Sequence, residues 1–102
     1  MTAVCTTCVN KKEAQKIAKI LIEKKLAACA VMFPVKSVYQ WKGKLEQSKE
    51  YVLLVKALNE NFKKIEIEIK KHHSYKLPCI LGFDVSKYSK DYFKWVREQT
   101  SV

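Results

Sequence analysis

The chain has 102 residues, 48% of them hydrophobic, which is the size of one domain (residues 1–102) with a single core. This size excludes a multi-domain enzyme, and the lack of any apolar run near the roughly 20 residues that cross a bilayer excludes a membrane span. The formal net charge is +10, but only Arg97 among the 20 basic residues is an arginine, so a solvated lysine surface is favoured over a nucleic-acid site that reads bases.

The first two predicted elements are a strand and a helix. The run Ala3 to Thr7 is apolar and β-branched, as in a short strand. Asn10 and Glu13 have the spacing of a capping box, and apolar residues then recur with helical periodicity. We therefore predict a helix from about Lys11 to Lys25.

A long hairpin is predicted next. The continuous apolar segment Leu26 to Phe33 is predicted to be a strand, which Pro34 either bends or leaves partly unpaired. The strand pattern continues to Trp41, the segment 42–44 is typical of a tight turn, and Tyr51 to Val55 forms the returning strand.

The segment from Asn59 to His72 has two possible interpretations. Phe62, Ile65 and Ile69 follow a helical stripe, whereas Ile65, Ile67 and Ile69 alternate with glutamates as in a strand. The length of the segment, without Gly or Pro, favours a helix capped by Asn59, with Ile67 lying off the apolar stripe.

A fourth strand is predicted over 77–85, followed by a helix that Ser89 caps and that runs to about Glu98. The order β-α-β-β-α-β with a terminal helix is typical of an α+β, ferredoxin-like fold, in which two helices cover one face of an antiparallel sheet. The other face carries many apolar residues, so we expect the protein to associate with itself.

The four cysteines are expected to be free thiols in a reducing compartment. Met1 to Cys5 does not resemble a secretory signal, so the expected location is the cytoplasm. Cys5 and Cys8 form a C-x-x-C pair, which can hold a soft metal ion. However, residues three apart in a strand face opposite sides of the sheet, which favours separate structural roles for the two thiols.

A second candidate metal site involves histidine. His72 and His73 point in different directions on a helix, so only one of them is expected in a site. His72 is best explained as a favourable charge at a helix C-terminus. His73 with Cys79 or Cys29 would suit copper or zinc, with a neighbouring subunit adding ligands.

The sequence shows no catalytic apparatus. It contains only two glycines, so it has no glycine-rich loop that could bind a phosphate. It also has no pattern that would place a nucleophilic side chain beside a general base. We therefore do not expect an enzyme. Trp41 and Trp95 are expected in the core or in an interface rather than as base-stacking platforms.

Several segments together resemble the CutA family of divalent-cation tolerance proteins over nearly the whole chain. They are Leu26-Ala27-Ala28-Cys29, the Tyr39-x-Trp41-x-Gly43 pattern, Glu50, Val55-Lys56, His73-x-Tyr75-x-x-Pro78 and the segment 92–96. The resemblance implies a ferredoxin-like protomer in a homotrimer whose hairpin arms pair between subunits, and a part in tolerance to copper and other divalent cations.

The resemblance also implies which residues form sites. The predicted metal ligands are His73, Cys79 and Cys29, of which the resemblance carries over His73 and Cys29 but not Cys79. The residues of a ligand-binding or interface cleft would be Tyr39, Trp41, Glu50, Lys56 and Tyr75. The chain departs from the family pattern at Ala57, usually Thr, and at Cys79, usually Glu, a change that would favour Cu(I) or Zn if this position touches an ion. Two other functions remain open, a PII-like sensor of a small anionic metabolite that binds through Lys56, and a basic nucleic-acid binder.

Overall fold

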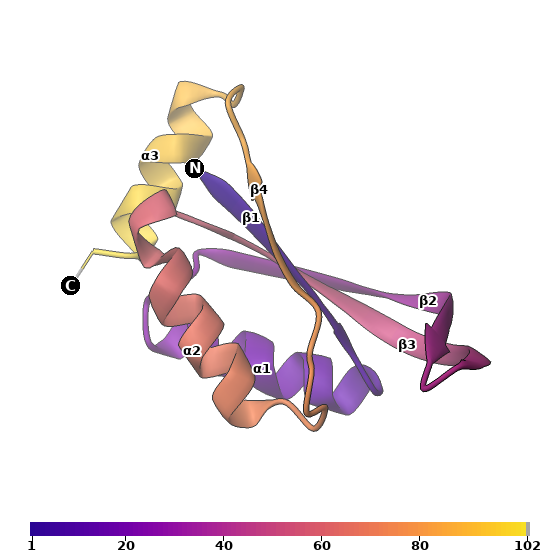
Figure 1. The fold of residues 1–102 in the computed structure, drawn as a ribbon. Helices are drawn as coiled ribbons and strands as arrows, with labels where there is room; N and C mark the ends of the chain where they lie inside the picture. The colour runs from indigo at the N-terminus through magenta and orange to yellow at the C-terminus, as the bar shows by residue number, and fades with distance from the viewer. Residues whose placement is uncertain (102) are drawn as a thin grey trace.

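A computed structural model describes residues 1–101 as one four-stranded antiparallel sheet with helices (Figure 1). The strands are β1 (Thr2–Cys8), β2 (Cys29–Trp41), β3 (Lys44–Ala57) and β4 (Ile80–Asp84), in the order β2-β3-β1-β4. The helices are α1 (Lys11–Glu23), α2 (Phe62–His72), preceded by the 3₁₀ turn η1 (Asn59–Asn61), and α3 (Lys90–Gln99). The predicted α+β fold is confirmed. No helix within residues 1–101 is both long and apolar enough to cross a membrane.

The start of α1 follows the prediction and its end does not. Asn10 Oδ1 accepts the Glu13 N–H at 2.9 Å, and Glu13 Oε1 accepts the Val9 N–H at 3.1 Å. Lys25 adopts the left-handed conformation, with φ of 59°, so the helix ends at Glu23 rather than Lys25. The chain then turns back on itself, and β2 begins at Cys29 rather than at Leu26.

Strands β2 and β3 form a long hairpin arm (Figure 1). Trp41 pairs with Lys44 across a two-residue turn in which Lys42 and Gly43 have φ of 52° and 77°. Positive φ at both positions matches the type I′ turn that fits the twist of a hairpin. Pro34 does not interrupt β2, where it pairs with Tyr51, because β2 is an edge strand and can dispense with one donor.

The segment after β3 is helical, as the sequence predicts, but its start differs. Ile65 and Ile69 are buried, whereas Ile67 is 62% exposed. The burial therefore follows the 3.6-residue period of a helix and not the two-residue period of a strand. The prediction that Asn59 caps the helix is wrong. Asn59 opens the 3₁₀ turn, and α2 starts three residues later without a side-chain cap.

The last two elements are a short strand and the terminal helix. Strand β4 covers only Ile80–Asp84 of the predicted 77–85, because the chain before it, which contains Pro78, forms a loop. Ser89 Oγ accepts the Tyr92 N–H at 3.2 Å, and the rings of Tyr88 and Phe93 stack with centroids 4.9 Å apart. The predicted cap and hydrophobic staple of α3 are therefore confirmed.

The two faces of the sheet differ in burial. Alternate residues of β1 and β3 pack against α1 and α2 in a single core that includes Val4, Leu53 and Val55. The opposite face leaves large apolar side chains exposed, namely Val31, Phe33, Leu81 and Phe83. Such a contiguous apolar patch is typical of a protein interface.

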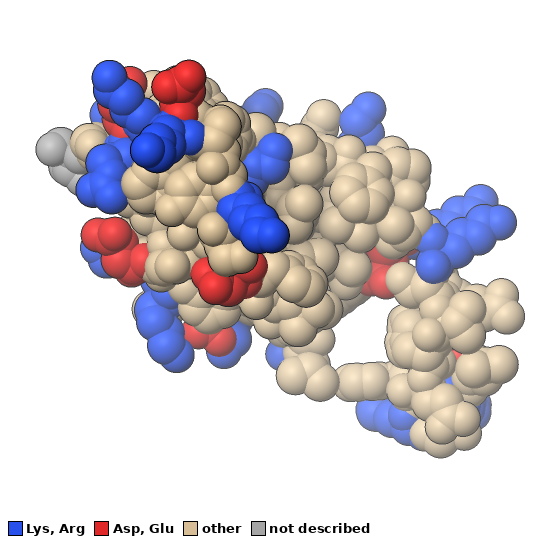
Figure 2. All heavy atoms as spheres, turned by 90° about the horizontal axis from the view of Figure 1, so that it is seen from above, with Lys and Arg blue, Asp and Glu red and all other residues tan. Residues whose placement is uncertain are grey.

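Basic and acidic side chains are interspersed on the visible surface rather than gathered into one basic stripe (Figure 2). This arrangement supports the interpretation of the lysines as a solvated surface.

Candidate functional site

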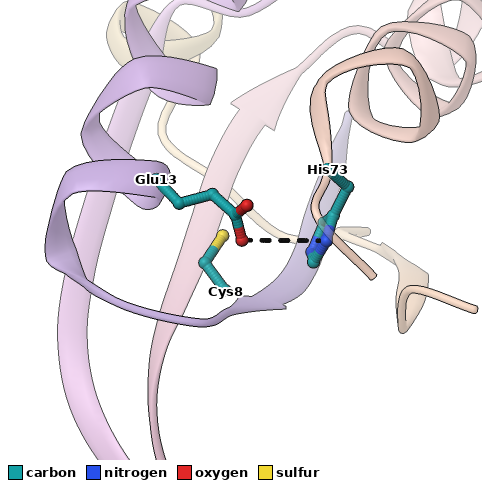
Figure 3. Close-up of side chains that lie close together, drawn as sticks. All are labelled: Cys8, Glu13 and His73. Atoms are coloured by element: carbon teal, nitrogen blue, oxygen red, sulfur yellow. Dashed lines mark ion pairs between the residues drawn. The ribbon is translucent and has the colours of Figure 1, made fainter. Parts of the chain in front are cut away.

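Three side chains that can bind a metal meet where β1, α1 and α2 approach one another. Cys8 is the last residue of β1, Glu13 lies in the first turn of α1, and His73 follows the end of α2. One potential ligand atom from each lies within 4.8 Å of the other two, and the side chains point toward a common centre (Figure 3). Cys8 and Glu13 are five residues apart in the sequence, whereas His73 is distant and reaches them only through the fold.

Hydrogen bonds hold the imidazole of His73 in one orientation. Its Nε2 lies 2.9 Å from the Thr7 carbonyl oxygen, and its Nδ1 accepts the Tyr75 N–H at 3.1 Å. Because a carbonyl can only accept and an amide N–H can only donate, these contacts require the neutral ring with its proton on Nε2. The same Nδ1 atom lies 3.7 Å from Oε1 of Glu13.

Glu13 joins the helix start to the chain that follows α2. Its Oε1 accepts the Val9 N–H, and its Oε2 accepts the Ser74 N–H at 2.9 Å. Burial alone would raise its pKa, but the hydrogen bonds from Ser74 and Val9 hold the pKa of this carboxyl below its usual range. Glu13 is therefore ionised at neutral pH.

Cys8 is completely buried, and it stays protonated in the absence of a metal. Burial, together with the charges of Glu13 and Glu50, raises the pKa of its thiol to about 12. Cys5 lies on the other face of the sheet, as the alternating burial of β1 shows. The two thiols of the C-x-x-C pair therefore point away from each other, as the strand geometry predicts.

The other two predicted metal ligands lie apart from this cluster. Cys79 is exposed in the loop before β4. Across the sheet, Cys29 pairs with Lys56, and Lys56 pairs with Ala3 of β1. His73 contacts Thr7, which lies four residues, or about 13 Å, farther along β1 than Ala3. Within one chain, Cys29 and His73 cannot hold the same ion, so that prediction requires a second subunit.

In the neighbouring histidine, His72, the Nε2 atom lies 3.4 Å from Oε2 of Glu68, which is on the same helix, α2. This contact agrees with its predicted structural role at the helix end.

Four of the five predicted cleft residues do gather. Tyr39, Trp41, Glu50 and Tyr75 line one cavity between the hairpin arm and the loop after α2. Lys56 lies six residues, or about 20 Å, along β3 from Glu50, and its Nζ sits 5.7 Å from the centre of the Tyr92 ring. Lys56 is therefore not part of this cavity.

Comparison with known proteins agrees with this fold. The family model described as "CutA1 divalent ion tolerance protein" matches residues 2–99. The chain belongs to this family. The divalent-cation tolerance protein CutA of Archaeoglobus fulgidus is 41% identical to it over 92 residues, 90% of each chain.

Solved CutA structures match the whole fold. The structure of the A. fulgidus protein, described as periplasmic, superposes with a TM-score of 0.97 at 38% identity and covers 99% of this chain and 100% of that one. The crystal structure of CutA1 from Pyrococcus horikoshii gives a TM-score of 0.96 at 32% identity and covers both chains completely. The chain thus has a role in divalent-cation tolerance like that of its CutA relatives.

Of the three clustered residues, the sequence predicts His73 as a ligand, considers Cys8 only as a partner of Cys5 and favours a structural role for it, and gives Glu13 no role as a ligand. Glu13 was recognised only as half of a capping box. The one signal for its place beside the cysteine is that Glu13 follows Cys8 by only five residues.

Replacing Glu13 by glutamine tests the structural half of its role. We expect Glu13→Gln to lower the free energy of unfolding by about 1 kcal/mol at pH 7, because the amide can accept only one of the two N–H bonds. The folded-state pKa lies below the unfolded one, so this stabilisation is complete above the unfolded pKa and is lost as the pH falls through the folded pKa. Urea unfolding of both proteins at pH 7 and pH 3 should therefore show a difference that shrinks in acid.

Proposed function

We propose that this CutA-family protein binds a divalent or copper ion through Cys8, Glu13 and His73, and that this binding underlies its role in divalent-cation tolerance. The observation that carries the proposal is the approach of three different ligand atoms to within 4.8 Å of one another. A thiolate, an imidazole and a carboxylate together suit zinc or copper better than magnesium or calcium, which prefer sites made only of oxygen.

The surroundings of His73 support this assignment. A metal-bound histidine usually donates its other ring N–H to a carbonyl or carboxylate, and His73 already does so through Nε2 to Thr7. The Nδ1 atom then lies 3.7 Å from Oε1 of Glu13. An ion at Nδ1 has to displace only the Tyr75 N–H, which is the sole hydrogen bond that binding would break at this ring.

The proton on Cys8 makes binding depend on pH. Because the pKa of this thiol is about 12 without a metal, an ion must displace one proton to bind the sulfur. We expect affinity for Zn²⁺ to fall by about tenfold for each unit by which the pH is lowered from 7.5.

Calorimetric titration with Zn²⁺ in two buffers of different ionisation enthalpy measures both the affinity and the protons released. The expected result is one bound ion per chain with release of about one proton. Absence of saturable binding, or binding without proton release, would contradict the use of Cys8 as a ligand.

We further propose that the protein acts as a homotrimer. The exposed apolar residues on the open face of the sheet supply a surface for such an assembly. It would also let Cys29 or Cys79 of one subunit approach the His73 region of another, as the sequence predicts. The four unpaired cysteines, all within the described residues, fit a cytoplasmic location, and we propose a binding rather than an enzymatic role.

Light scattering with a matched pair of variants tests the assembly. We expect the unmodified protein to have about three times the mass of one chain at micromolar concentration, since obligate interfaces resist dilution. Phe83→Lys, on the open sheet face, should shift the protein to monomer, whereas Ile67→Lys, on the outer side of α2, should not, although both positions are more than half exposed in the single chain. Equal masses for the two variants would place the interface elsewhere.

A further inference from the structure

Tyr75 connects the proposed metal site to the hairpin arm, and its first contact is with the metal site. Its N–H donates to Nδ1 of His73 at 3.1 Å, and its ring packs beside the imidazole with centroids 4.8 Å apart. The Nδ1 atom is the one that His73 would offer to an ion, so this hydrogen bond occupies the lone pair that the ion needs. An ion can therefore bind His73 only when the Tyr75 N–H moves away.

The other end of Tyr75 is held by the arm. Its hydroxyl donates to Oε2 of Glu50 on β3 at 2.8 Å, and Oε1 of the same carboxylate accepts the hydroxyl of Ser37 on β2. A continuous series of hydrogen bonds thus runs from His73 through Tyr75 and Glu50 to Ser37. All of these groups belong to one chain, so the link does not depend on what a neighbouring subunit places beside the arm.

The bond between Tyr75 and Glu50 is costly to break because the carboxylate is buried. Glu50 is only 7% exposed, and no lysine or arginine pairs with it among the ion pairs of residues 1–101. A hydroxyl bound to a carboxylate contributes more than a bond between two neutral groups. Glu50 therefore favours the position in which the Tyr75 N–H stays on His73.

We propose that Tyr75 is a latch that couples occupancy of the metal site to the hairpin arm. The proposal rests on the proposed function, since the ion concerned is the one held by Cys8, Glu13 and His73. When the latch is closed, Tyr75 bonds both His73 and Glu50, and when it is open, the ion takes the place of the Tyr75 N–H. Because coupling between two sites is reciprocal, the bond from the arm weakens metal binding, and a bound ion weakens that bond.

Hydrogen exchange of the Tyr75 amide, followed by NMR at pH 7.5, tests the latch in the metal-free protein. This N–H exchanges only when it leaves its acceptor on His73. Replacing Tyr75 by Phe keeps the ring and removes the bond to Glu50, so exchange at position 75 should be about 2- to 10-fold faster, the effect of one hydrogen bond. Glu50→Gln, which replaces the charged acceptor by a neutral one, should change it in the same direction.

Tyr51→Phe is the matched control. Tyr51 follows Glu50 on β3, and its hydroxyl is not a donor in any hydrogen bond to Glu50 found within residues 1–101. Removal of this hydroxyl should leave exchange of the Tyr75 amide unchanged.

Calorimetric titration with Zn²⁺ at the same pH tests the coupling to the metal. Tyr75→Phe should bind Zn²⁺ about 2- to 10-fold more tightly than the unmodified protein, because opening the latch then breaks one hydrogen bond fewer. Tyr51→Phe should bind Zn²⁺ with unchanged affinity. A gain in affinity separates a latch from structural damage, since a distorted site would bind the ion more weakly. Bound Zn²⁺ should in turn speed exchange of the Glu50 amide at the base of the arm.

Two results would overturn the latch. One is unchanged exchange of the amide at position 75 in both Tyr75→Phe and Glu50→Gln, which would show that the arm does not hold the loop. The other is a Zn²⁺ affinity of Tyr75→Phe that is equal to or below that of the unmodified protein. If exchange is faster in the variants but no protein binds Zn²⁺ saturably, the link between arm and loop is supported, and it is the proposed metal site that fails.

Discussion

Cys8→Ala is expected to abolish specific binding of Zn²⁺ or copper. Loss of an outer hydrogen-bonding partner of a metal ligand commonly weakens binding by about 10- to 100-fold, and loss of the only thiolate should exceed that. Alanine leaves His73 and Glu13 with their hydrogen bonds to the backbone and removes only the sulfur. Calorimetric titration of the variant against the unmodified protein measures the effect.

Cys5→Ala is the matched control. It removes the other thiol of the same C-x-x-C pair, which lies on the opposite face of the sheet, and should leave affinity unchanged. Because Cys8 is fully buried, urea unfolding of both variants without metal should accompany the titrations. Loss of binding in Cys5→Ala with retention in Cys8→Ala would refute the assignment. Retention in both, with loss in His73→Ala or Cys79→Glu, would favour the ligand set His73, Cys79 and Cys29 that the sequence predicts.

Gly82→Ala is expected to destabilise the fold by about 1–3 kcal/mol, the usual cost of overpacking a core. Gly82 pairs with Val4 in the middle of β4, and its backbone conformation is open to any residue. A Cβ atom there would lie 2.8 Å from the Cε1 atom of Phe62, the first residue of α2. The absence of a side chain lets the Phe62 ring rest on the sheet.

A double-mutant cycle separates this contact from any general effect of substitution. Phe62→Leu removes the clashing ring, so Gly82→Ala should cost clearly less in that background than in the original protein, as urea unfolding would show. Gly43 provides a contrast, because nothing lies within 4 Å of a Cβ atom there. The loss of stability in Gly43→Ala would come from the backbone φ of 77°, which alanine adopts less readily than glycine. If Gly82→Ala costs the same with and without the Phe62 ring, the close contact does not explain the glycine.

The sequence predicted the elements better than their ends. The caps Asn10 and Ser89 were recognised because a side chain bonds an amide three residues away, which is a purely local interaction. The end of α1 depends on the left-handed conformation of Lys25, and lysine carries no signal for it. Asn59 was misplaced because it resembles a helix cap although a 3₁₀ turn separates it from α2.

The candidate metal site shows what local patterns leave out. His73 was picked out, but its neighbours Cys8 and Glu13 come from the other end of the chain and depend on how β1 ends beside α2. The family resemblance groups the rings and the carboxylate of the cavity together, and it includes Lys56 with them. The register of β3 separates Lys56 from the others, and periodicity cannot reveal this register.

Pro34 affects how the outer edge of β2 can be used by other chains. Trp41 and Lys44 close a two-residue turn and so form a hydrogen-bonded pair, and alternation along the continuous register makes Pro34 and Tyr51 a non-hydrogen-bonded pair. The missing N–H of Pro34 therefore belongs to the free edge. A strand added there would leave one carbonyl without a donor, which protects this 13-residue arm against indiscriminate sheet extension and fibril growth.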